Sequence, residues 1–367
     1  MAQAQSPIQT VIIIVKENHG FDNYFGTFPG VNGGPRLQPA PNPPTSDPKH
    51  THEAWLTRKT TAAALQYTES DIPAYFRYAR QFTLCDNYFT AVAGPSTPNH
   101  FMLIAADSPL INNPHGYRGQ PQQTYDLASL PDLLEHAGRT WGSYTSGYPF
   151  SLIRKLGGRH RKPQTQFAVD AETGKLPNVS WLYGPAGLDE HPLGNVTDGM
   201  AWTVAQVAAV ARGPQWPTCA IFITWDDWGG WADHVDPPVL EKWTDGTPFF
   251  PGGRVGCLAL SPYAKRGYVS KVQHTHVSLV KFCEVTFGLP TLNRRDAASD
   301  GMEDCFDFSA APNLTPPDDG GAQAAKSTRK TAAKKAARTR KATGSTGRKS
   351  GAKKAVRKKT MRKKRGS

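Results

Sequence analysis

One group of ionisable side chains directly follows an apolar run of the 367-residue sequence. Asp226 and Asp227 come after residues 219–225, and Asp233 and His234 follow a Gly-Gly turn that is flanked by tryptophans. Carboxylates this close together repel one another unless a cation or a cationic side chain lies among them. The pattern therefore indicates a metal site, although a solvated acidic turn beside a helix cap would give the same local sequence.

A second pair of oxygen ligands, Glu17 and Asn18, follows the apolar run 11–15. If both apolar runs are strands of one parallel sheet, their carboxyl ends lie at the same edge, so these side chains can meet the aspartates. Oxygen ligands alone favour hard cations such as Mg²⁺, Mn²⁺ or Ca²⁺, whereas a histidine among them shifts the preference towards Zn²⁺ or Fe. The residues thus point to one divalent cation without deciding its identity.

Hydroxyl side chains occur in residues 94–100, Gly-Pro-Ser-Thr-Pro-Asn-His, just before the apolar residues 101–104. A proline at 98 suits the first turn of a helix. Because the N-terminus of a helix attracts anions, a phosphate can rest there with Ser96 beside it. An ordinary serine or threonine helix cap is the alternative that these residues leave open.

Two of the eleven histidines lie in polar surroundings that suit acid–base chemistry. His191 stands in Asp-Glu-His-Pro within a loop rich in Gly and Asn, and His234 lies beside the aspartates. Either imidazole could transfer a proton or contact a phosphate. A surface or core position without a role is the other interpretation for both, and His136, within a helical pattern, is given no role.

The secondary-structure elements that must position these residues predict an α/β fold. Residues 11–15, 219–225 and 255–260 are continuous apolar runs, typical of strands that are buried on both faces, and each ends in polar residues. Apolar side chains recur with helical spacing over 130–137, before Gly138, and over 279–287, before Gly288. Strands that alternate with helices predict a mostly parallel sheet covered on both faces, a three-layer α/β/α sandwich.

In this order, the clusters resemble the phosphoesterase family that contains bacterial phospholipases C and acid phosphatases, which is related to the alkaline phosphatase superfamily. The resemblance runs from Ile12 to about Phe308. Seven motifs in the same order are specific evidence for this resemblance, whereas a single motif would be weak evidence. They are IVKENHGFDNYFGTFPG at 14–30, GPSTPNH at 94–100, LPDLLEHAGRTW at 130–141, EHP at 190–192, FITWDDWGGWADHVDPP at 222–238, RVGCLALSPYAKRGYV at 254–269 and HTHVSLVKFCEVTFGLPTLNRRD at 274–296.

The resemblance implies roles for several candidate residues. Glu17, Asn18, Asp226 and Asp227 match the metal-binding positions. Ser96 matches the nucleophile, with Thr97 as the weaker candidate. His191 matches a family histidine that contacts the phosphoryl oxygens or acts as the acid, while His234 is an acid–base candidate because of its position beside the aspartates. Asn99, His100 and, less securely, His52 are the expected substrate contacts.

The mechanism that the resemblance implies is in-line attack by Ser96 to form a phosphoserine, which water then hydrolyses. The metal is Mg²⁺, Mn²⁺, Ca²⁺ or Zn²⁺. Two positions depart from the family pattern: His100 stands where many members have arginine, and His19 replaces the more usual residues after Glu-Asn. Larger phospholipases of the family also carry C-terminal β domains, and this chain has a basic tail instead, which weakens the expectation of lecithin hydrolysis.

Charge divides the chain into parts. Nineteen of the 43 Lys and Arg residues lie between Lys326 and Arg365, and none of the 30 acidic residues follows Asp319, so the net charge of +13 becomes −6 for residues 1–325. We predict a catalytic domain over 1–311, a linker over 312–325, and a disordered basic tail over 326–367. Such a tail binds polyanions, with nucleic acid the expected partner and an anionic membrane surface the alternative.

The remaining features describe an ordinary globular body. The five cysteines are odd in number and widely spaced, which predicts buried thiols. Neither a membrane-spanning run nor a recognisable signal peptide is present, so a cytoplasmic location is expected. The leading hypothesis is a metal-dependent hydrolase of phosphate esters. Its alternatives are a phospholipase C acting on glycerophospholipids and an inactive phosphoesterase body that binds nucleic acid.

Overall fold

The computed structural model describes residues 6–114, 123–242, 248–249, 251–318 and 320. Residues 1–320 form one compact unit. The basic tail predicted for 326–367 lies outside the described residues. Among the residues that are described, no helix combines the length and the apolar character needed to cross a bilayer.

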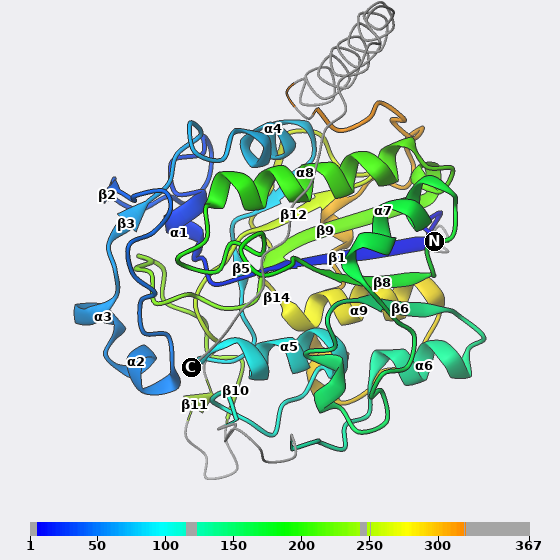
Figure 1. Ribbon diagram of the computed structural model, residues 1–367, viewed down its shortest axis with the longest axis horizontal. Coiled ribbons are helices and arrows are strands. Elements are labelled where there is room, and N and C mark those ends of the chain that lie inside the picture. Colours follow the sequence, from blue (N-terminus) through cyan, green and yellow to red (C-terminus); the bar gives the residue numbers. More distant parts are fainter. Residues whose placement is uncertain (1–5, 115–122, 243–247, 250, 319, 321–367) are drawn as a thin grey trace, which may run out of the picture. The chain divides into compact units, whose positions relative to one another are not determined.

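An eight-stranded sheet forms the middle layer of this unit (Figure 1). Seven strands run in one direction, and only β12 is antiparallel to its neighbours. In order across the sheet the strands are β13 (Tyr268–Ser270), β4 (Thr83–Cys85), β12 (Cys257–Leu260), β9 (Cys219–Trp225), β1 (Thr10–Lys16), β8 (Val179–Tyr183), β6 (Trp141–Tyr144) and β7 (Arg161–Lys162).

The two longest strands are the apolar runs that the sequence singled out. β1 lies between β8 and β9, and every residue of β1 and of β9 is buried. A central strand of a covered sheet has no solvent-facing side, which is why both runs are apolar without alternation. The prediction of a mostly parallel sheet is confirmed.

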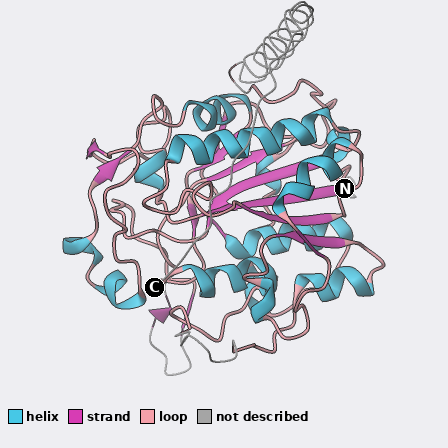
Figure 2. Ribbon diagram, in the orientation of Figure 1, coloured by secondary structure: helices cyan, strands magenta, loops and turns pink. Residues whose placement is uncertain are grey.

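Helices cover both faces of the sheet (Figures 1 and 2). One face carries α4 (Pro73–Gln81), α7 (Gln164–Glu172) and α8 (Val196–Arg212), and the other carries α5 (Ser96–Ala105), α6 (Leu130–His136) and α9 (His276–Phe287). Gly288 ends α9 in the left-handed conformation with φ of 65°, as the sequence predicted. The expected three-layer α/β/α sandwich is therefore confirmed.

Shorter elements lie around these layers. Three two-stranded sheets pair β10 (Glu241–Lys242) with β11 (Pro248–Phe249), β14 (His274–Thr275) with β5 (Tyr88–Phe89), and β2 (Gln38–Pro39) with β3 (Leu65–Gln66). The short helices are α1 (Phe21–Tyr24), α2 (His52–Leu56), α3 (Arg58–Thr61) and α10 (Arg294–Ala298), and the 3₁₀ turns are η1 (Phe150–Leu152), η2 (Trp216–Thr218) and η3 (Glu303–Cys305).

The third predicted strand differs from the expectation in direction. It begins at Cys257 rather than at residue 255, and it runs antiparallel to β9. Its polar end at Ser261 therefore lies at the edge of the sheet opposite the carboxyl ends of β1 and β9. An apolar run carries no signal of strand direction, so the sequence did not show this.

The C-terminal boundary of the folded unit lies beyond the predicted residue 311. Asn313 N donates to the Pro262 carbonyl over 2.7 Å, and Trp216 Nε1 donates to the Leu314 carbonyl over 3.3 Å. Asp318 N donates to Gln81 Oε1 over 2.7 Å. The described part of the expected linker thus lies along the body. All five cysteines are buried thiols, as predicted.

Candidate active site

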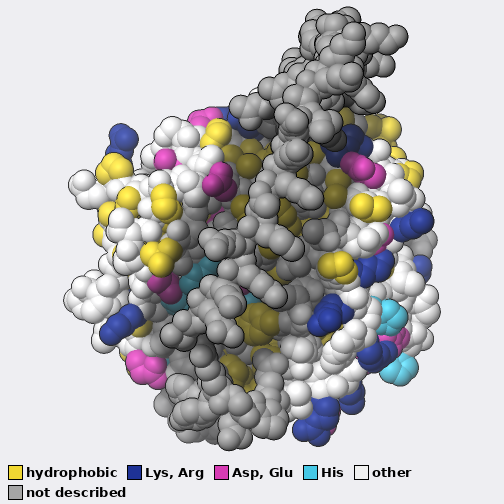
Figure 3. All heavy atoms as spheres, viewed as in Figure 1, with side chains coloured by type: hydrophobic (Ala, Val, Ile, Leu, Met, Phe, Trp, Pro, Cys, Tyr) yellow, Lys and Arg dark blue, Asp and Glu magenta, His cyan; other side chains and the backbone are white. Residues whose placement is uncertain are grey.

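The carboxyl ends of β1, β8 and β9 bring the first candidate residues together. The Glu17 amide donates to the Asp189 carbonyl over 2.9 Å, and the Asp226 amide donates to the Lys16 carbonyl over 2.9 Å. The hydrogen-bonding pattern of the sheet thus continues one residue beyond the strands. The structure confirms that residues more than 200 positions apart meet at this edge, and Figure 3 shows histidine and acidic side chains at the surface near it.

A tight turn after β9 holds Asn18 against Asp226. Asn18 has a left-handed backbone with φ of 56°, and its amide donates to Asp226 Oδ1 over 3.0 Å. Gly229, with φ of 63°, packs so closely that a Cβ atom there would lie 2.1 Å from the Asn18 carbonyl oxygen. The Gly-Gly turn is therefore required by this close approach as well as by its backbone conformation.

The carboxylates at this edge are removed from water. Asp226 and Asp227 are fully buried, and the Glu17 side chain is 18% exposed. Burial, followed by the charge of Glu17, raises the pKa of Asp226 to about 6, and burial, followed by the charge of Asp226, raises that of Asp227. Burial also raises the pKa of Glu17. A cation among these groups would reverse all three shifts.

The site fits a divalent cation by the polar atoms that it leaves unsatisfied. Within the described part of the chain, Asp226 Oδ2 and both ring nitrogens of His100 are buried and make no hydrogen bond. His100 Nε2 lies 3.4 Å from Asp226 Oδ2 and 3.6 Å from Glu17 Oε1. Ligand atoms of these three residues all lie within 4.8 Å of one another, a spacing that one metal ion can bridge.

The side chain of Asn18 supports the same conclusion. Its oxygen faces Glu17 Oε2 and Asp226 Oδ1, each 3.2 Å away, while its nitrogen faces His191 and His50. Three acceptors that face one another are unfavourable unless a cation lies between them or the amide turns over. The oxygen-rich side of this arrangement suits a hard divalent ion.

Ser96 is the first residue of α5, and its hydroxyl donates to Asp227 Oδ2 over 3.1 Å. The other oxygen of Asp227 accepts from the Gly229 amide over 2.7 Å, so the carboxylate is held in place. The predicted nucleophile and the predicted metal ligands are therefore in contact. Thr97, the weaker candidate, is 2.9 Å from the Tyr148 hydroxyl instead.

Asn99 is not placed to bind substrate, contrary to expectation. It is fully buried, its Oδ1 accepts from the Val92 amide over 2.8 Å, and its Nδ2 faces the carbonyls of Val92, Gly94 and Pro95 at 3.1–3.2 Å. Because both ends of its amide are used by the backbone, Asn99 holds the loop that presents Ser96.

His100 also differs from its expected role. Its side chain is fully buried behind the carboxylates, where burial lowers its pKa. A neutral imidazole against Glu17 and Asp226 is a candidate metal ligand rather than a substrate contact. The sequence showed that histidine stands at this position in place of the arginine of many family members, but it did not show which way the side chain faces.

His191 reaches the site, as predicted. Its Nε2 lies 3.1 Å from the Asn18 amide, and its Nδ1 lies 2.7 Å from the Pro192 carbonyl. Burial disfavours the charged ring, but the Pro192 carbonyl and the charge of Glu17 oppose it, and the net effect is a raised pKa for His191. His191 is therefore suited to act as an acid.

His234 and His52 do not join these residues directly. His234 Nδ1 lies 2.6 Å from Asp22 Oδ2, in a separate cluster where Arg254 pairs with Asp22 and Asp233. The Gly-Gly turn directs the chain away from Asp226, which sequence proximity could not reveal. His52 Nδ1 is 2.7 Å from the Ala93 carbonyl, so it contacts the loop before Ser96 rather than the carboxylates.

Two histidines that the sequence left without a role are close to the site. His50 Nε2 lies 3.3 Å from Asn18 Nδ2. His276, the first residue of α9, has Nε2 2.7 Å from the Asp226 carbonyl and Nδ1 3.0 Å from the Tyr88 hydroxyl. His50 is two residues from the expected His52, and of these two histidines it is His50 that contacts Asn18.

A cavity of about 710 Å³ is lined in part by Pro95, the residue before Ser96. Most of its described lining residues carry polar side chains, Lys49, His50 and Asn112 among them. The cavity therefore offers space for a polar group close to the loop that presents Ser96.

A buried carboxylate set that fits a divalent cation, in contact with a serine hydroxyl at a helix N-terminus, is an arrangement suited to metal-assisted ester hydrolysis. The model of the Phosphoesterase family matches residues 8–64 and 45–290. The chain therefore belongs to the phosphoesterase family and is an enzyme that hydrolyses phosphoric esters.

Several curated relatives are named phospholipases C. Phospholipase C B of Mycobacterium tuberculosis is 26% identical over 418 residues, which cover 84% of this chain and 80% of the relative. Non-hemolytic phospholipase C of Pseudomonas aeruginosa is 28% identical over 407 residues, covering 84% of this chain and 58% of the relative. Non-specific phospholipase C6 of Arabidopsis thaliana is 26% identical over 396 residues, covering 86% of this chain and 75% of the relative.

Proposed function

We propose that the enzyme cleaves phosphate esters through a covalent intermediate on Ser96. The supporting observation is the hydrogen bond of 3.1 Å from Ser96 Oγ to Asp227 Oδ2, at the first residue of α5 and next to the buried carboxylates. Ser96 Oγ forms a bond to phosphorus as the ester oxygen leaves on the opposite side, and water then releases phosphate from the serine.

The surrounding side chains supply the charge and proton chemistry. Asp227 Oδ2 orients the Ser96 hydroxyl and can accept its proton, while the N-terminus of α5 favours negative charge at that oxygen. A divalent cation held by Glu17, Asn18, Asp226 and Asp227 would lower the pKa of the hydroxyl and neutralise charge on the phosphate. His191, with its raised pKa, donates a proton to the departing alcohol.

The cavity favours a polar ester over a lipid. Its described lining residues include Asp47, Lys49, Thr51, Glu53 and Asn112, and the only residues with wholly non-polar side chains among the described lining are prolines. A diacylglycerol leaving group would be matched better by large aliphatic or aromatic side chains, which are not among these described residues. We therefore propose a water-soluble phosphate ester as substrate. Phospholipase C activity on glycerophospholipids is the alternative, and it is favoured by the names of the relatives.

Two matched hydroxyl variants test the nucleophile. Ser96→Ala removes the attacking group, so turnover of a chromogenic phosphate ester is expected to fall to background. Thr97→Ala removes the adjacent hydroxyl, whose contact is Tyr148, and should retain most of the turnover. Acid quenching during turnover followed by peptide mass spectrometry should find phosphate on Ser96. Full turnover by Ser96→Ala would disprove the assignment.

A substrate panel separates the two substrate proposals. The wild-type enzyme is compared on a phosphomonoester, a soluble phosphodiester and phosphatidylcholine vesicles, before and after chelation and with each of Mg²⁺, Mn²⁺, Ca²⁺ and Zn²⁺ added back. The polar cavity predicts higher kcat/KM on a soluble ester. Preferential release of diacylglycerol would instead establish the phospholipase alternative.

For the basic tail we propose binding to nucleic acid by release of counterions. The support is its composition, with 19 Lys and Arg residues and no acidic residue between 326 and 365. Ser96→Ala should retain DNA binding that weakens steeply with salt. DNA binding by a wild-type protein that hydrolyses none of the esters, with any metal, would favour the inactive-body alternative.

A further inference from the structure

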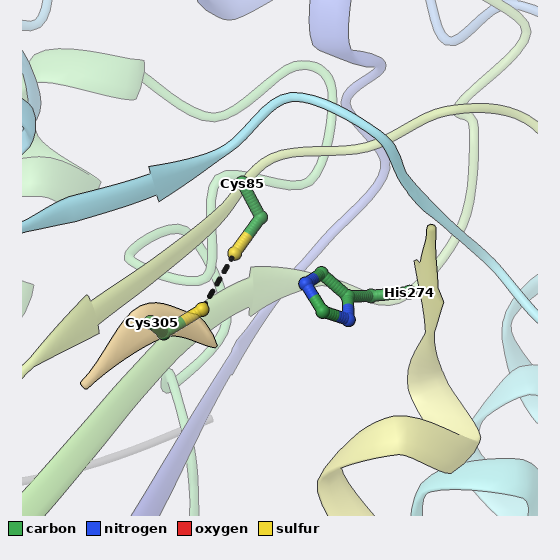
Figure 4. Close-up of side chains that lie close together, drawn as sticks. All are labelled: Cys85, His274 and Cys305. Carbon is green, nitrogen blue, oxygen red and sulfur yellow. Dashed lines mark hydrogen bonds between the residues drawn. The ribbon is translucent and has the colours of Figure 1, made fainter. Parts of the chain in front are cut away.

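Two thiols and an imidazole meet in the core, away from the active site. Cys85 at the end of β4, His274 at the start of β14 and Cys305 at the end of η3 place their ligand atoms within 4.8 Å of one another (Figure 4). All three residues are fully buried. Two sulfurs and one imidazole nitrogen are ligands that zinc and other borderline cations prefer.

Three of the distances among Cys85, His274, Cys305 and the neighbouring Asp304 are close to the edges of a tetrahedral metal site. Cys85 Sγ and Cys305 Sγ are 3.5 Å apart. Asp304 Oδ1 lies 3.2 Å from His274 Nε2 and 3.6 Å from Cys305 Sγ. Zinc bonds of about 2.3 Å to sulfur and about 2.0–2.2 Å to nitrogen or oxygen place tetrahedral ligands roughly 3.3–3.8 Å apart. The separations that involve Asp304 differ from this range by no more than about 0.1 Å, and the two sulfurs would move apart by about 0.3 Å to reach the roughly 3.8 Å expected of two zinc-bound thiolates.

The surroundings supply the outer contacts that metal-binding histidines usually have. His274 Nδ1 lies 2.9 Å from Asp300 Oδ1, so a carboxylate orients the ring with Nε2 directed towards the sulfurs. The Ser270 hydroxyl donates to Asp304 Oδ2 and fixes that carboxylate. The side chains of Asp300 and Asp304 are 34% and 19% exposed, which gives an ion a route from solvent.

We propose that Cys85, His274 and Cys305, with Asp304 as the fourth ligand, bind one structural divalent cation for which zinc is the best fit. Binding releases both thiol protons to solvent and leaves the imidazole neutral. The site is chemically distinct from the oxygen-rich active site because two of its ligands are thiolates. It joins strand β4 to η3 and to β14, which leads directly into α9 and the contact of His276 with Asp226.

Cobalt substitution tests this site independently of activity. The reduced full-length protein is stripped by chelation and titrated with Co²⁺, and a sulfur-to-cobalt charge-transfer band in the near ultraviolet is expected at one ion per chain. Zinc should displace the band. Cys85→Ser and Cys305→Ser should abolish it, while Cys219→Ser and Cys283→Ser, buried thiols elsewhere, and Asp226→Asn at the active site should keep it.

A milder variant covers the case in which the cysteine substitutions prevent folding. Asp300→Asn, at a partly exposed position, removes only the carboxylate behind His274 and should weaken zinc binding by about 10- to 100-fold. Absence of the band from the reduced wild-type protein, or its persistence in both Cys85→Ser and Cys305→Ser, would overturn the proposal. A Cys85–Cys305 disulfide in protein freshly purified without reductant would also do so.

Discussion

Replacement of Asn99 by alanine separates a positioning role from substrate binding. The change leaves the buried Val92 amide without its acceptor, 2.8 Å away, and removes the Nδ2 donor from the carbonyls of residues 92, 94 and 95. An orphaned buried donor costs about 1–3 kcal/mol, and each lost hydrogen bond costs about 1 kcal/mol. Because Nδ2 has two protons, two such bonds are lost, and the expected destabilisation is about 3–5 kcal/mol.

The assay is urea unfolding combined with steady-state kinetics. Asn99→Ala should lower the free energy of unfolding by this amount and reduce kcat, since the loop that presents Ser96 loses its anchor. Asn87→Ala is the matched control, because among the described residues the Asn87 side chain makes one hydrogen bond, from Nδ2 to the Lys271 carbonyl near the surface. Its expected effect is under about 0.5 kcal/mol. A variant of normal stability whose only defect is a raised KM would refute the reasoning and restore the substrate-binding role.

Three further outcomes are expected. Burial, together with the neighbouring Asp296, raises the pKa of Glu284 to about 8 from an ordinary value of 4.5. The preference of the folded state for protonated Glu284 therefore stabilises the protein fully below pH 4.5, and this stabilisation is lost as the pH rises through 8. This loss of stability amounts to a few kcal/mol, at about 1.4 kcal/mol per pKa unit. Glu284→Gln should remove it, as measured by urea unfolding from pH 5 to 9. Gly229→Ala would place a Cβ 2.1 Å from the Asn18 carbonyl and should lower kcat/KM on the order of 100-fold, measured with saturating metal. Truncation after residue 325 should abolish salt-sensitive DNA binding, measured by fluorescence anisotropy, and leave turnover of a soluble ester unchanged.

The sequence predicted the layers of the fold and the convergence of four candidate metal ligands because both depend on apolar runs and strand ends. β1 and β9 are continuous apolar runs, so their central position and the meeting of Glu17 with Asp226 followed from pattern alone. The direction of β12 could not be predicted in this way, because an apolar run has the same pattern in a parallel and in an antiparallel strand.

The roles of individual histidines depended on side-chain directions that no local pattern encodes. His234 is close to Asp227 in sequence, but two glycines with positive φ, at 229 and 230, turn the chain towards Asp22. His50 and His276 reach the site from loops and helices that are distant in sequence. Only the packing of those elements decides which imidazole faces the carboxylates.

The Glu-His-Pro motif shows why neighbouring motif residues can have unrelated roles. Glu190 is fully buried, pairs with Lys16 over 3.3 Å, and accepts hydrogen bonds from Tyr24, Tyr75 and Trp225. Removing one partner of a buried pair leaves an uncompensated charge, which costs about 3–5 kcal/mol. Glu190 therefore fixes the loop in a left-handed conformation, with φ of 75°, and the next residue, His191, is directed at the Asn18 amide. Since Lys16 precedes Glu17 at the end of β1, one buried ion pair positions both the proposed acid and a candidate metal ligand, and a defect in either partner should impair both.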